Sequence, residues 1–372
     1  MNTRTNTGGI TQPSIDRSTR AKDGGRRSRL GHGPARALLA AMAAALIAAG
    51  CTSSSAGGTR EASGGRPERG GQALATRQAN GSGRPIARAR VAVGGSRPER
   101  VVVIVEENHS IDQIIGSPAA PFINRLARNG ALLTGYTANT HPSLPNYIAM
   151  LSGDTHGITT NCSHCTVDAP SLVDQLDRAG ISWKAYMQGL PGTCSTAYRA
   201  GAYVKSHNPF LYFRGIQDDP ARCRKVVSFQ RLNADIASGR LPRFVFISPD
   251  VAHDMHGTGR GGNGRLVATG DRQLRDLLTR LASSPAWRQD TRVVVTWDEG
   301  RLGVRTRGPC CGTRNTGGHI ATIVAGPRVR PARDATPYNH DALLRSIETV
   351  FGLPYLGHAG DPSTRVIPAL TG

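Results

Sequence analysis

The sequence predicts an α/β domain over residues 99–365, with a mostly parallel central sheet and helices on both faces. Two observations predict this class. Short apolar runs rich in β-branched residues recur along this part of the chain, as in strands that are buried on both faces of a parallel sheet. Segments with a helical spacing of apolar residues lie between those runs, and such alternation is typical of α/β domains.

Each expected strand is a short apolar run, and four are predicted: Val101–Val105, Phe244–Ile247, Val293–Thr296 and Ile320–Val324. The expected helices have apolar residues three or four positions apart, and they cover Pro121–Leu132, a segment through Tyr147–Leu151, Ser171–Ala179, Leu266–Leu281 and Ala342–Val350. The longest of them carries its leucines on one face, as expected for a helix that packs against a sheet.

The first fifty residues carry the features of an export signal. Arginines precede an apolar stretch over residues 38–49, which is too short to span a membrane, and small residues follow it. The pair Gly50–Cys51 resembles the end of a bacterial lipoprotein signal, so residues 1–50 are predicted to be removed and Cys51 to anchor the protein to the membrane through a lipid. Ordinary cleavage nearby, with loss of Cys51 and secretion, is the alternative.

Residues 51–98 are rich in Gly, Ser, Arg and Pro, so we expect a disordered basic linker. Residues 1–100 hold 17 Lys+Arg and 5 Asp+Glu, a net charge of +12 out of +20 for the whole chain. The strongly basic character therefore belongs mainly to the tail. For that reason no nucleic-acid partner is expected for the folded domain.

The six cysteines after Cys51 favour disulfides, because an exported chain meets an oxidising environment. Cys194–Cys223 is the best single prediction of a pair. Cys162–Cys165 has the spacing of half a zinc site. Its natural partner would be the adjacent pair Cys310–Cys311, which is poorly spaced for zinc, so zinc–thiolate binding is the less favoured alternative.

Acidic and histidine side chains follow three of the predicted strands. They are grouped in Glu106–Asn108, in Ser248–His256 and in Trp297–Gly300. A single acidic residue at a strand end is usually a turn former. Ligands of open α/β sheets bind beyond the carboxyl ends of the strands, so three such groups at one edge predict a functional site.

Ser143 is predicted to join this site. It lies between two prolines in the segment 141–147, His-Pro-Ser-Leu-Pro-Asn-Tyr, just before an apolar helical run. Proline suits the first turn of a helix, so Ser143 is expected at a helix N-terminus, where backbone N–H groups and the helix dipole favour an anion. A serine that only caps the helix is the simpler interpretation when the segment is taken alone.

Carboxylates, an amide and imidazoles suit a divalent cation, whose identity and number the sequence leaves open. Such an ion would stabilise a Ser143 alkoxide and polarise a phosphoryl oxygen. That chemistry predicts attack of Ser143 on phosphorus, a phosphoserine intermediate and its hydrolysis by water.

Other polar residues suit the remaining steps of that reaction. The expected donors to the phosphoryl oxygens are Asn161, Lys205 and His207. A proton for the leaving alcohol is expected from His256 or His253. For Lys205, a solvated surface position is almost as well supported as a role in binding.

Five segments together resemble the phosphoesterase family of bacterial acid phosphatases and phospholipases C, which belongs to the alkaline-phosphatase-like superfamily. They are Glu106–Asn108, Thr140–Tyr147, Ser206–Phe210, Asp254–His256 and Thr296–Glu299. The resemblance covers about residues 100–360 and is closest to members that hydrolyse phosphoinositides. It implies an alkaline-phosphatase-like fold and an acid phosphatase that acts on phosphate monoesters of a small molecule or a phospholipid headgroup.

The resemblance also implies roles for single residues. The positions that match metal ligands are Glu107, Asn108, Ser143, Asp298 and Glu299, with His319 where superfamily members often carry a further ligand. Ser143 is implied as the nucleophile, Asp254 and His256 as catalytic partners, and Asn161 as a contact of the phosphoryl group.

One stretch departs from the family pattern. Asp250 and His253 stand where asparagines are expected in close relatives. Together with Asp254 and His319 they leave open a second metal position. The departure is equally consistent with a tolerated change at the rim of the site.

Other functions stay open beside the acid phosphatase. A phospholipase C or phosphodiesterase would use the same core with a differently shaped mouth. A non-catalytic surface lipoprotein would bind phosphorylated ligands or wall polymers through its basic linker. A sulfatase is disfavoured, because the segment after Ser143 lacks the arginine of a Cys/Ser-x-Pro-x-Arg pattern.

Overall fold

The computed structural model describes residues 97–257, 262–303 and 308–372. The expected signal segment over 1–50, Cys51 and nearly all of the expected linker lie outside these residues. No helix within the described ranges is both long and apolar enough to cross a membrane.

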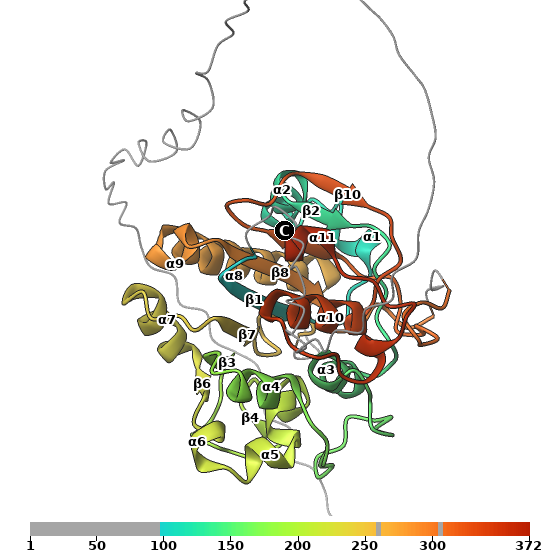
Figure 1. The fold of residues 1–372 in the computed structure, drawn as a ribbon. Helices are drawn as coiled ribbons and strands as arrows, with labels where there is room; N and C mark the ends of the chain where they lie inside the picture. Colours follow the sequence, from blue (N-terminus) through green and yellow to red (C-terminus); the bar gives the residue numbers. More distant parts are fainter. Residues whose placement is uncertain (1–96, 258–261, 304–307) are drawn as a thin grey trace, which may run out of the picture. The chain divides into compact units, whose positions relative to one another are not determined.

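Eight strands of the described residues form one sheet, in the order β10-β2-β9-β8-β1-β7-β3-β6 (Figure 1). Their bounds are β1 Arg100–Glu106, β2 Ala131–Leu133, β3 Trp183–Met187, β6 Val226–Ser228, β7 Phe244–Ser248, β8 Thr291–Trp297, β9 Thr322–Ala325 and β10 Ala332–Asp334. β9 runs antiparallel to both of its neighbours, and the other pairs are parallel. The prediction of a mostly parallel sheet is confirmed.

β8, β1 and β7 lie at the centre of the sheet, and each is buried along its whole length. Val102 of β1 is in register with Val245 on one side and with Val293 on the other. The apolar runs inside them, such as Val101–Val105 of β1, follow from burial on both faces, because few side chains of such strands reach water. Since the three strands are parallel, their carboxyl ends reach the same edge of the sheet.

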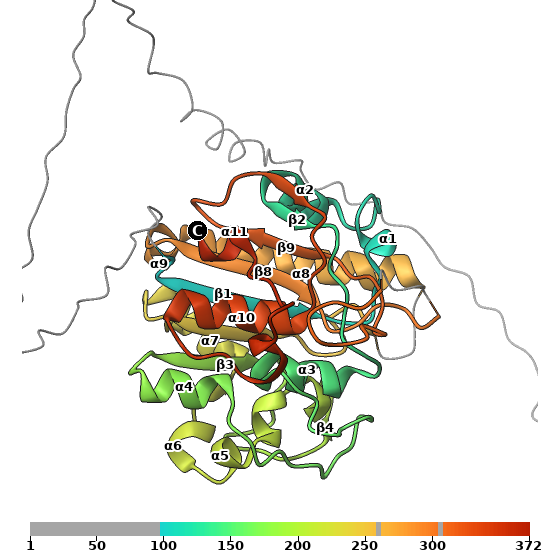
Figure 2. The same ribbon diagram turned by 45° about the vertical axis from the view of Figure 1, so that its right-hand side comes forward.

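Helices cover both faces of the sheet (Figure 2). On one face α3 packs against α4 and α10, and α10 packs against α11. The bounds are α3 Ser143–Ser152, α4 Leu172–Arg178, α10 His340–Phe351 and α11 Pro368–Thr371. On the other face α8 packs against α2, α7 and α9. These helices cover α2 Pro121–Asn129, α7 Phe229–Ala237, α8 Asn263–Ser283 and α9 Pro285–Arg288.

The shorter elements lie in the loops that connect these layers. They are α1 Ile111–Ile114, α5 Arg214–Gln217, α6 Pro220–Cys223, the hairpin of β4 Arg199–Ala200 and β5 Tyr203–Val204, and the 3-10 turns η1 Lys205–His207, η2 Pro209–Tyr212 and η3 Gly357–Gly360. Of these, η1 matters most for the site, because it carries His207.

Two predicted boundaries are wrong. The helix expected to reach Leu132 ends at Asn129, and residues 131–133 form β2 instead. A Cβ on Gly130 would lie 2.5 Å from the carbonyl oxygen of Val324, so glycine allows the chain to turn directly into its pairing with β9. The strand expected from Ile320 begins at Thr322.

Three disulfides join the six cysteines of the folded domain. Cys194–Cys223 is one of them, so that predicted pairing is confirmed. The other two are Cys162–Cys165 and Cys310–Cys311. The zinc–thiolate alternative is wrong, because each of these sulfurs is bonded to another sulfur and no thiolate is left to bind zinc.

Candidate active site

The polar groups that follow β1, β7 and β8 meet at one edge of the sheet, as predicted. The backbone N–H of Glu107, after β1, donates to the carbonyl oxygen of Asp254, 2.8 Å away in the loop after β7. The N–H of Asn108 donates to Asp298 Oδ1, 3.0 Å away, directly after β8. β1 lies between the other two strands, so its carboxyl end forms the middle of the site.

Ser143 is the first residue of α3, as predicted, and its side chain is buried against the same group. Its Oγ donates to Glu107 Oε2 at 3.2 Å. Tyr147, four residues later, lies on the same face of α3 and donates through its hydroxyl to Glu107 Oε1. One face of α3 therefore holds both oxygens of the Glu107 carboxylate.

His207 approaches this carboxylate from η1. Its Nδ1 lies 3.2 Å from Asp254 Oδ2 and 3.4 Å from Glu107 Oε1. The imidazole is buried and stacks on the Tyr147 ring, with centroids 5.8 Å apart and planes 12° apart. One ligand atom from each of Glu107, His207 and Asp254 lies within 4.8 Å of the others, which makes this group a candidate metal site.

Burial dominates the electrostatics of the site. It raises the pKa of Glu107 well above its usual range, with Asp298 as the next cause, and it raises the pKa of Asp254 to about 8. Burial and then the Glu299 charge raise the pKa of Asp298 to about 7. For His207 burial lowers the pKa to about 3, so this imidazole stays neutral. A divalent cation would reverse the shifts of the carboxyl groups, because it favours their charged form, and it would reinforce the shift of His207, because it favours the neutral imidazole.

Unsatisfied polar atoms in this group of residues also indicate that a cation can bind there. Among the described residues, Asp254 Oδ2, Asp298 Oδ2 and His207 Nδ1 are buried without a hydrogen-bond partner. Buried polar atoms are nearly always satisfied, so unsatisfied ligand atoms in one site point to a missing partner. Carboxylate and imidazole ligands suit a divalent ion.

His256 lies at the exposed side of this group. Its backbone N–H donates to Asp254 Oδ1 at 2.8 Å, and its Nδ1 donates to the carbonyl oxygen of Gly257 at 3.0 Å. The second bond fixes the tautomer and leaves Nε2 as the nitrogen that takes up a proton. Its ring centroid lies 6.1 Å from that of His207.

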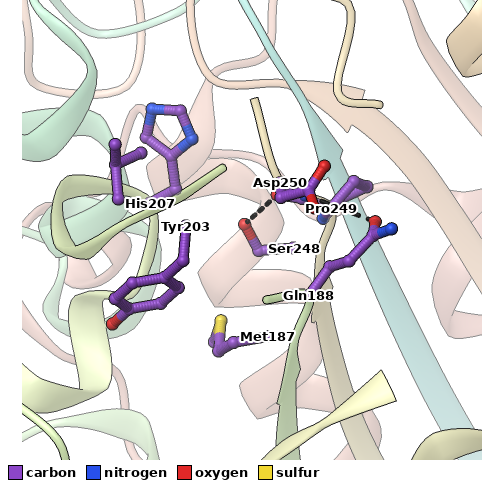
Figure 3. A pocket seen from close by; sticks show the side chains of 8 residues that line it. Met187, Gln188, Tyr203, His207, Ser248, Pro249 and Asp250 are labelled. Atoms are coloured by element: carbon purple, nitrogen blue, oxygen red, sulfur yellow. Dashed lines mark hydrogen bonds between the residues drawn. The ribbon is translucent and has the colours of Figure 1, made fainter. Parts of the chain in front are cut away.

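Asp250 and His253 pair with each other, Nδ1 to Oδ1, at 2.6 Å. Figure 3 shows that Asp250 lines a small cavity beside His207, between the carboxyl ends of β3 and β7. The second metal position left open for Asp250, His253, Asp254 and His319 differs from the group that the structure assembles, in which His207 and Glu107 accompany Asp254.

Asn161 lies beside the start of α3, where Asn161 Oδ1 accepts from the N–H of Leu144 at 2.9 Å. This bond leaves the amide NH₂ of Asn161 available to a ligand next to Ser143. The Lys205 ammonium group donates to the carbonyl oxygen of Ser163 at 3.4 Å and lies 4.2 Å from the Tyr212 ring centroid. These contacts place Lys205 against the loop that carries Asn161.

The last two predicted ligands have other partners. Glu299 Oε2 lies 2.8 Å from His141 Nδ1 and forms an ion pair with this imidazole when it is protonated. His319 Nε2 donates to the carbonyl oxygen of Thr134 at 2.9 Å. Their roles as metal ligands stay predictions.

Three residues of the site were not expected from the sequence: Tyr147, His141 and His340. His340 is buried at the start of α10, and its Nε2 donates to the carbonyl oxygen of Asp298 at 2.7 Å. A signal existed for Tyr147, because it lies four residues after Ser143 and therefore on the same helical face. His141 and His340 gave no such signal, because their partners are distant in the sequence.

A serine at a helix start, set among buried carboxylates and histidines at the edge of an α/β sheet, defines a phosphoryl-transfer type of site. The chain belongs to the Phosphoesterase family, which matches residues 117–354. The predictions of this family and of an enzyme that hydrolyses phosphoric esters are confirmed.

Curated relatives cover most of the chain. It is 34% identical over 262 residues to a phosphatidylinositol-3-phosphatase of Mycobacterium tuberculosis, a match over 70% of this chain and 79% of the relative. It is 30% identical over 312 residues to an acid phosphatase of Aspergillus niger, over 77% of this chain and 70% of the relative.

A solved structure shares the fold. It comes from work on the metabolism of glycosaminoglycans by Bacteroides thetaiotaomicron and superposes with a TM-score of 0.52 at 15% identity. The match covers 75% of this chain and 82% of the other. The predicted α/β fold class is confirmed.

Proposed function

We propose that this protein is a metal-dependent acid phosphatase that hydrolyses phosphate monoesters through a Ser143 phosphoserine, with phosphoinositides among its substrates. The observation that carries the proposal is the position of Ser143 Oγ, 3.2 Å from Glu107 Oε2 at the N-terminus of α3. The names of the M. tuberculosis and A. niger relatives support the substrate class.

In the first half-reaction Ser143 Oγ bonds to phosphorus as the bond from phosphorus to the ester oxygen breaks. Glu107 Oε2 receives the serine proton, and protonated His256 gives its Nε2 proton to the leaving alcohol. The N-terminus of α3 and the NH₂ group of Asn161 stabilise the charge on the phosphoryl oxygens.

In the second half-reaction water bonds to phosphorus and Ser143 Oγ leaves. Neutral His256 takes the proton of the water, and Glu107 returns the proton to Ser143. Phosphate is released with every group back in its first protonation state.

The residues that would hold a cation for this reaction are Glu107, Asn108, Ser143, Asp298 and Glu299. A bound divalent ion would supply Lewis-acid stabilisation of the serine oxygen and of the phosphoryl group. The buried carboxylates would hold that ion, and the bond from the Asn108 N–H to Asp298 Oδ1 keeps one of them in place.

We also propose that the protein is exported, either as a lipoprotein anchored at Cys51 or as a secreted enzyme. The support is the sequence of residues 26–51, with its arginines, short apolar stretch and Gly-Cys end. Labelling of the full chain with a lipid precursor, compared with Cys51→Ala, distinguishes the two forms.

Phosphate release from p-nitrophenyl phosphate tests the function between pH 4 and 9. We expect Ser143→Ala to lower turnover by at least ~10³-fold. Ser152→Ala is the matched control, because Ser152 is buried at the other end of α3. Faster hydrolysis of bis(p-nitrophenyl) phosphate than of the monoester would establish a diesterase instead. Equal activity of wild type and Ser143→Ala would remove the mechanism.

A further inference from the structure

The loop of residues 159–166 carries Asn161 beside the start of α3. Asn161 is exposed, and its Oδ1 accepts from the N–H of Leu144, the second residue of this helix. Among the described residues, no backbone-to-backbone hydrogen bond involves the loop. A segment without such bonds has little local stability of its own. The position of Asn161 must therefore come from side chains and from covalent bonds.

Two tyrosine hydroxyl groups hold the main chain of this loop. Tyr198 donates to the carbonyl oxygen of Asn161 at 3.0 Å, and Tyr212 donates to the carbonyl oxygen of Cys162 at 2.9 Å. Tyr212 is 0% exposed, so its hydroxyl is a fixed point in the fold. Because the two carbonyl groups belong to successive residues, these bonds set the direction of the main chain at Asn161.

Lys205 supports the next residue of the loop. Its ammonium group donates to the carbonyl oxygen of Ser163 at 3.4 Å and lies 4.2 Å from the centre of the Tyr212 ring. The residue is only 3% exposed, so a carbonyl oxygen and an aromatic face replace its water. These contacts favour a supporting role for Lys205 over direct contact with the phosphoryl group.

The Cys162–Cys165 disulfide closes the same loop directly after Asn161. It joins residues three positions apart, so it restricts the conformations of this short segment. Both cysteines are half-buried at the edge of the core. A bridge of this span ties no second element of the fold to the loop, in contrast to Cys194–Cys223, which links residues 29 positions apart. Its effect is therefore on the loop itself.

We infer that the Cys162–Cys165 disulfide is a positioning element for phosphoryl binding. It holds the main chain so that the NH₂ group of Asn161 faces a phosphoryl group on Ser143, and Tyr212 and Lys205 support the same position. Asn161 contacts the ligand, and the disulfide acts only through Asn161. The inference rests on the proposed role of Asn161 in the enzyme.

A double-mutant cycle separates this role from a general loss of stability. Calorimetric titration of the full-length protein with inorganic phosphate measures the affinity without turnover. We expect Asn161→Ala to weaken phosphate binding by ~10-fold or more, because a hydrogen bond to a charged group is lost. Replacement of both cysteines, Cys162→Ser with Cys165→Ser, should weaken it by ~5–10-fold in the wild type and by less than ~2-fold in the Asn161→Ala background.

Tyr212→Phe tests the same position with the disulfide intact. It keeps the buried ring and removes the hydroxyl that holds Cys162, so we expect phosphate binding to weaken by ~3–10-fold, and again only while Asn161 is present. Tyr186→Phe is the matched control. Tyr186 is also 0% exposed, but its hydroxyl donates to Asp235 Oδ2 of α7 at 2.8 Å, so its loss should leave the phosphate affinity unchanged.

Circular dichroism should show that the variants are folded. An unchanged affinity in the folded loop variants would overturn the inference, as would a loss that is equally large with and without Asn161. An affinity that Asn161→Ala leaves unchanged would overturn it too, because the disulfide is inferred to act through this residue. Phosphorylation of Ser143 during turnover would leave the proposed phosphatase intact in each of these cases.

Discussion

Tyr147 shows how one side chain outside the reacting groups can set the geometry of the site. It holds Glu107 Oε1 with its hydroxyl and His207 with its ring. Tyr147→Phe keeps the ring and removes the hydroxyl, so the Glu107 carboxylate loses its orientation. We expect the affinity for Mn²⁺ to fall by ~10–100-fold, as for other partners of metal ligands. Calorimetric titration of the stripped protein measures the change.

Tyr338→Phe is the control for that titration. Tyr338 is also buried and also donates to a carboxylate, Asp334 Oδ2 at 2.9 Å, but Asp334 belongs to β10 at the edge of the sheet. An unchanged Mn²⁺ affinity in Tyr147→Phe would show that Tyr147 does not position Glu107.

His256 acts as an acid only if the leaving group needs a proton. p-Nitrophenolate is stable enough to leave as an anion, whereas an alkoxide must be protonated as it leaves. We therefore expect His256→Gln to lower kcat/KM, which reports formation of the phosphoserine, by ~10²-fold or more on glycerol 2-phosphate and much less on p-nitrophenyl phosphate. His253→Gln should affect the two substrates alike. Equal losses on both substrates for His256→Gln would assign it a role in binding.

Much of the site was predictable from single residues, because groups that follow parallel strands must meet at one edge. Glu107, Asp254 and Asp298 were found in this way, and Ser143 from its prolines. The contacts of His207 were not predictable. They depend on the position of η1 against α3, which only the tertiary structure determines.

At the scale of elements, the strands that the sequence predicted are those buried at the centre, such as β1, whose apolar residues are unbroken. β3 was missed because Lys184 interrupts its apolar sequence. In the fold this lysine pairs with Asp235 of α7. β2 and β10 were missed because each has three residues, too few to show a periodicity.

α10 carries a buried carboxyl that makes stability depend on pH. Burial raises the pKa of Glu348 to about 8, and in the unfolded chain it returns to its ordinary value near 4.5. Between these pH values the folded protein keeps a proton that the unfolded chain releases. The contribution of Glu348 to the free energy of unfolding is therefore fully present at low pH and is lost as pH rises toward 8. Glu348→Gln should flatten the fall of the thermal midpoint between pH 5 and 8.

Glu99→Gln is the control for the Glu348→Gln measurement, because Glu99 is exposed. The thermal midpoint of Glu99→Gln should depend on pH as that of the wild type does. If the thermal midpoint of Glu348→Gln fell with pH as steeply as that of the wild type, a group other than Glu348 would cause the pH dependence.

At the scale of the whole molecule, bound cations should stabilise the fold more at high pH than at low pH. In the stripped protein the pKa values of Asp254, about 8, and Asp298, about 7, lie above their unfolded values. Their contribution to stability is therefore lost as pH rises from about 4 to about 8. Metal binding needs both groups ionised, so it competes with protons at low pH.

Calorimetry of the loaded and the stripped protein at pH 5 and pH 8 measures this effect. We expect the loaded protein to melt at the higher temperature, with the larger difference at pH 8. A difference that is larger at pH 5, or absent at both values, would contradict a cation held by these carboxylates.

The central claim is that Ser143 carries the phosphoryl group during turnover. The most direct measurement is a rapid acid quench of the full-length enzyme with excess p-nitrophenyl phosphate, followed by proteolysis and peptide mass spectrometry. The account predicts phosphate on Ser143 in the wild type and none on this peptide in Ser143→Ala. Phosphate on another residue, or rapid turnover with an unmodified Ser143 at every quench time, would contradict it.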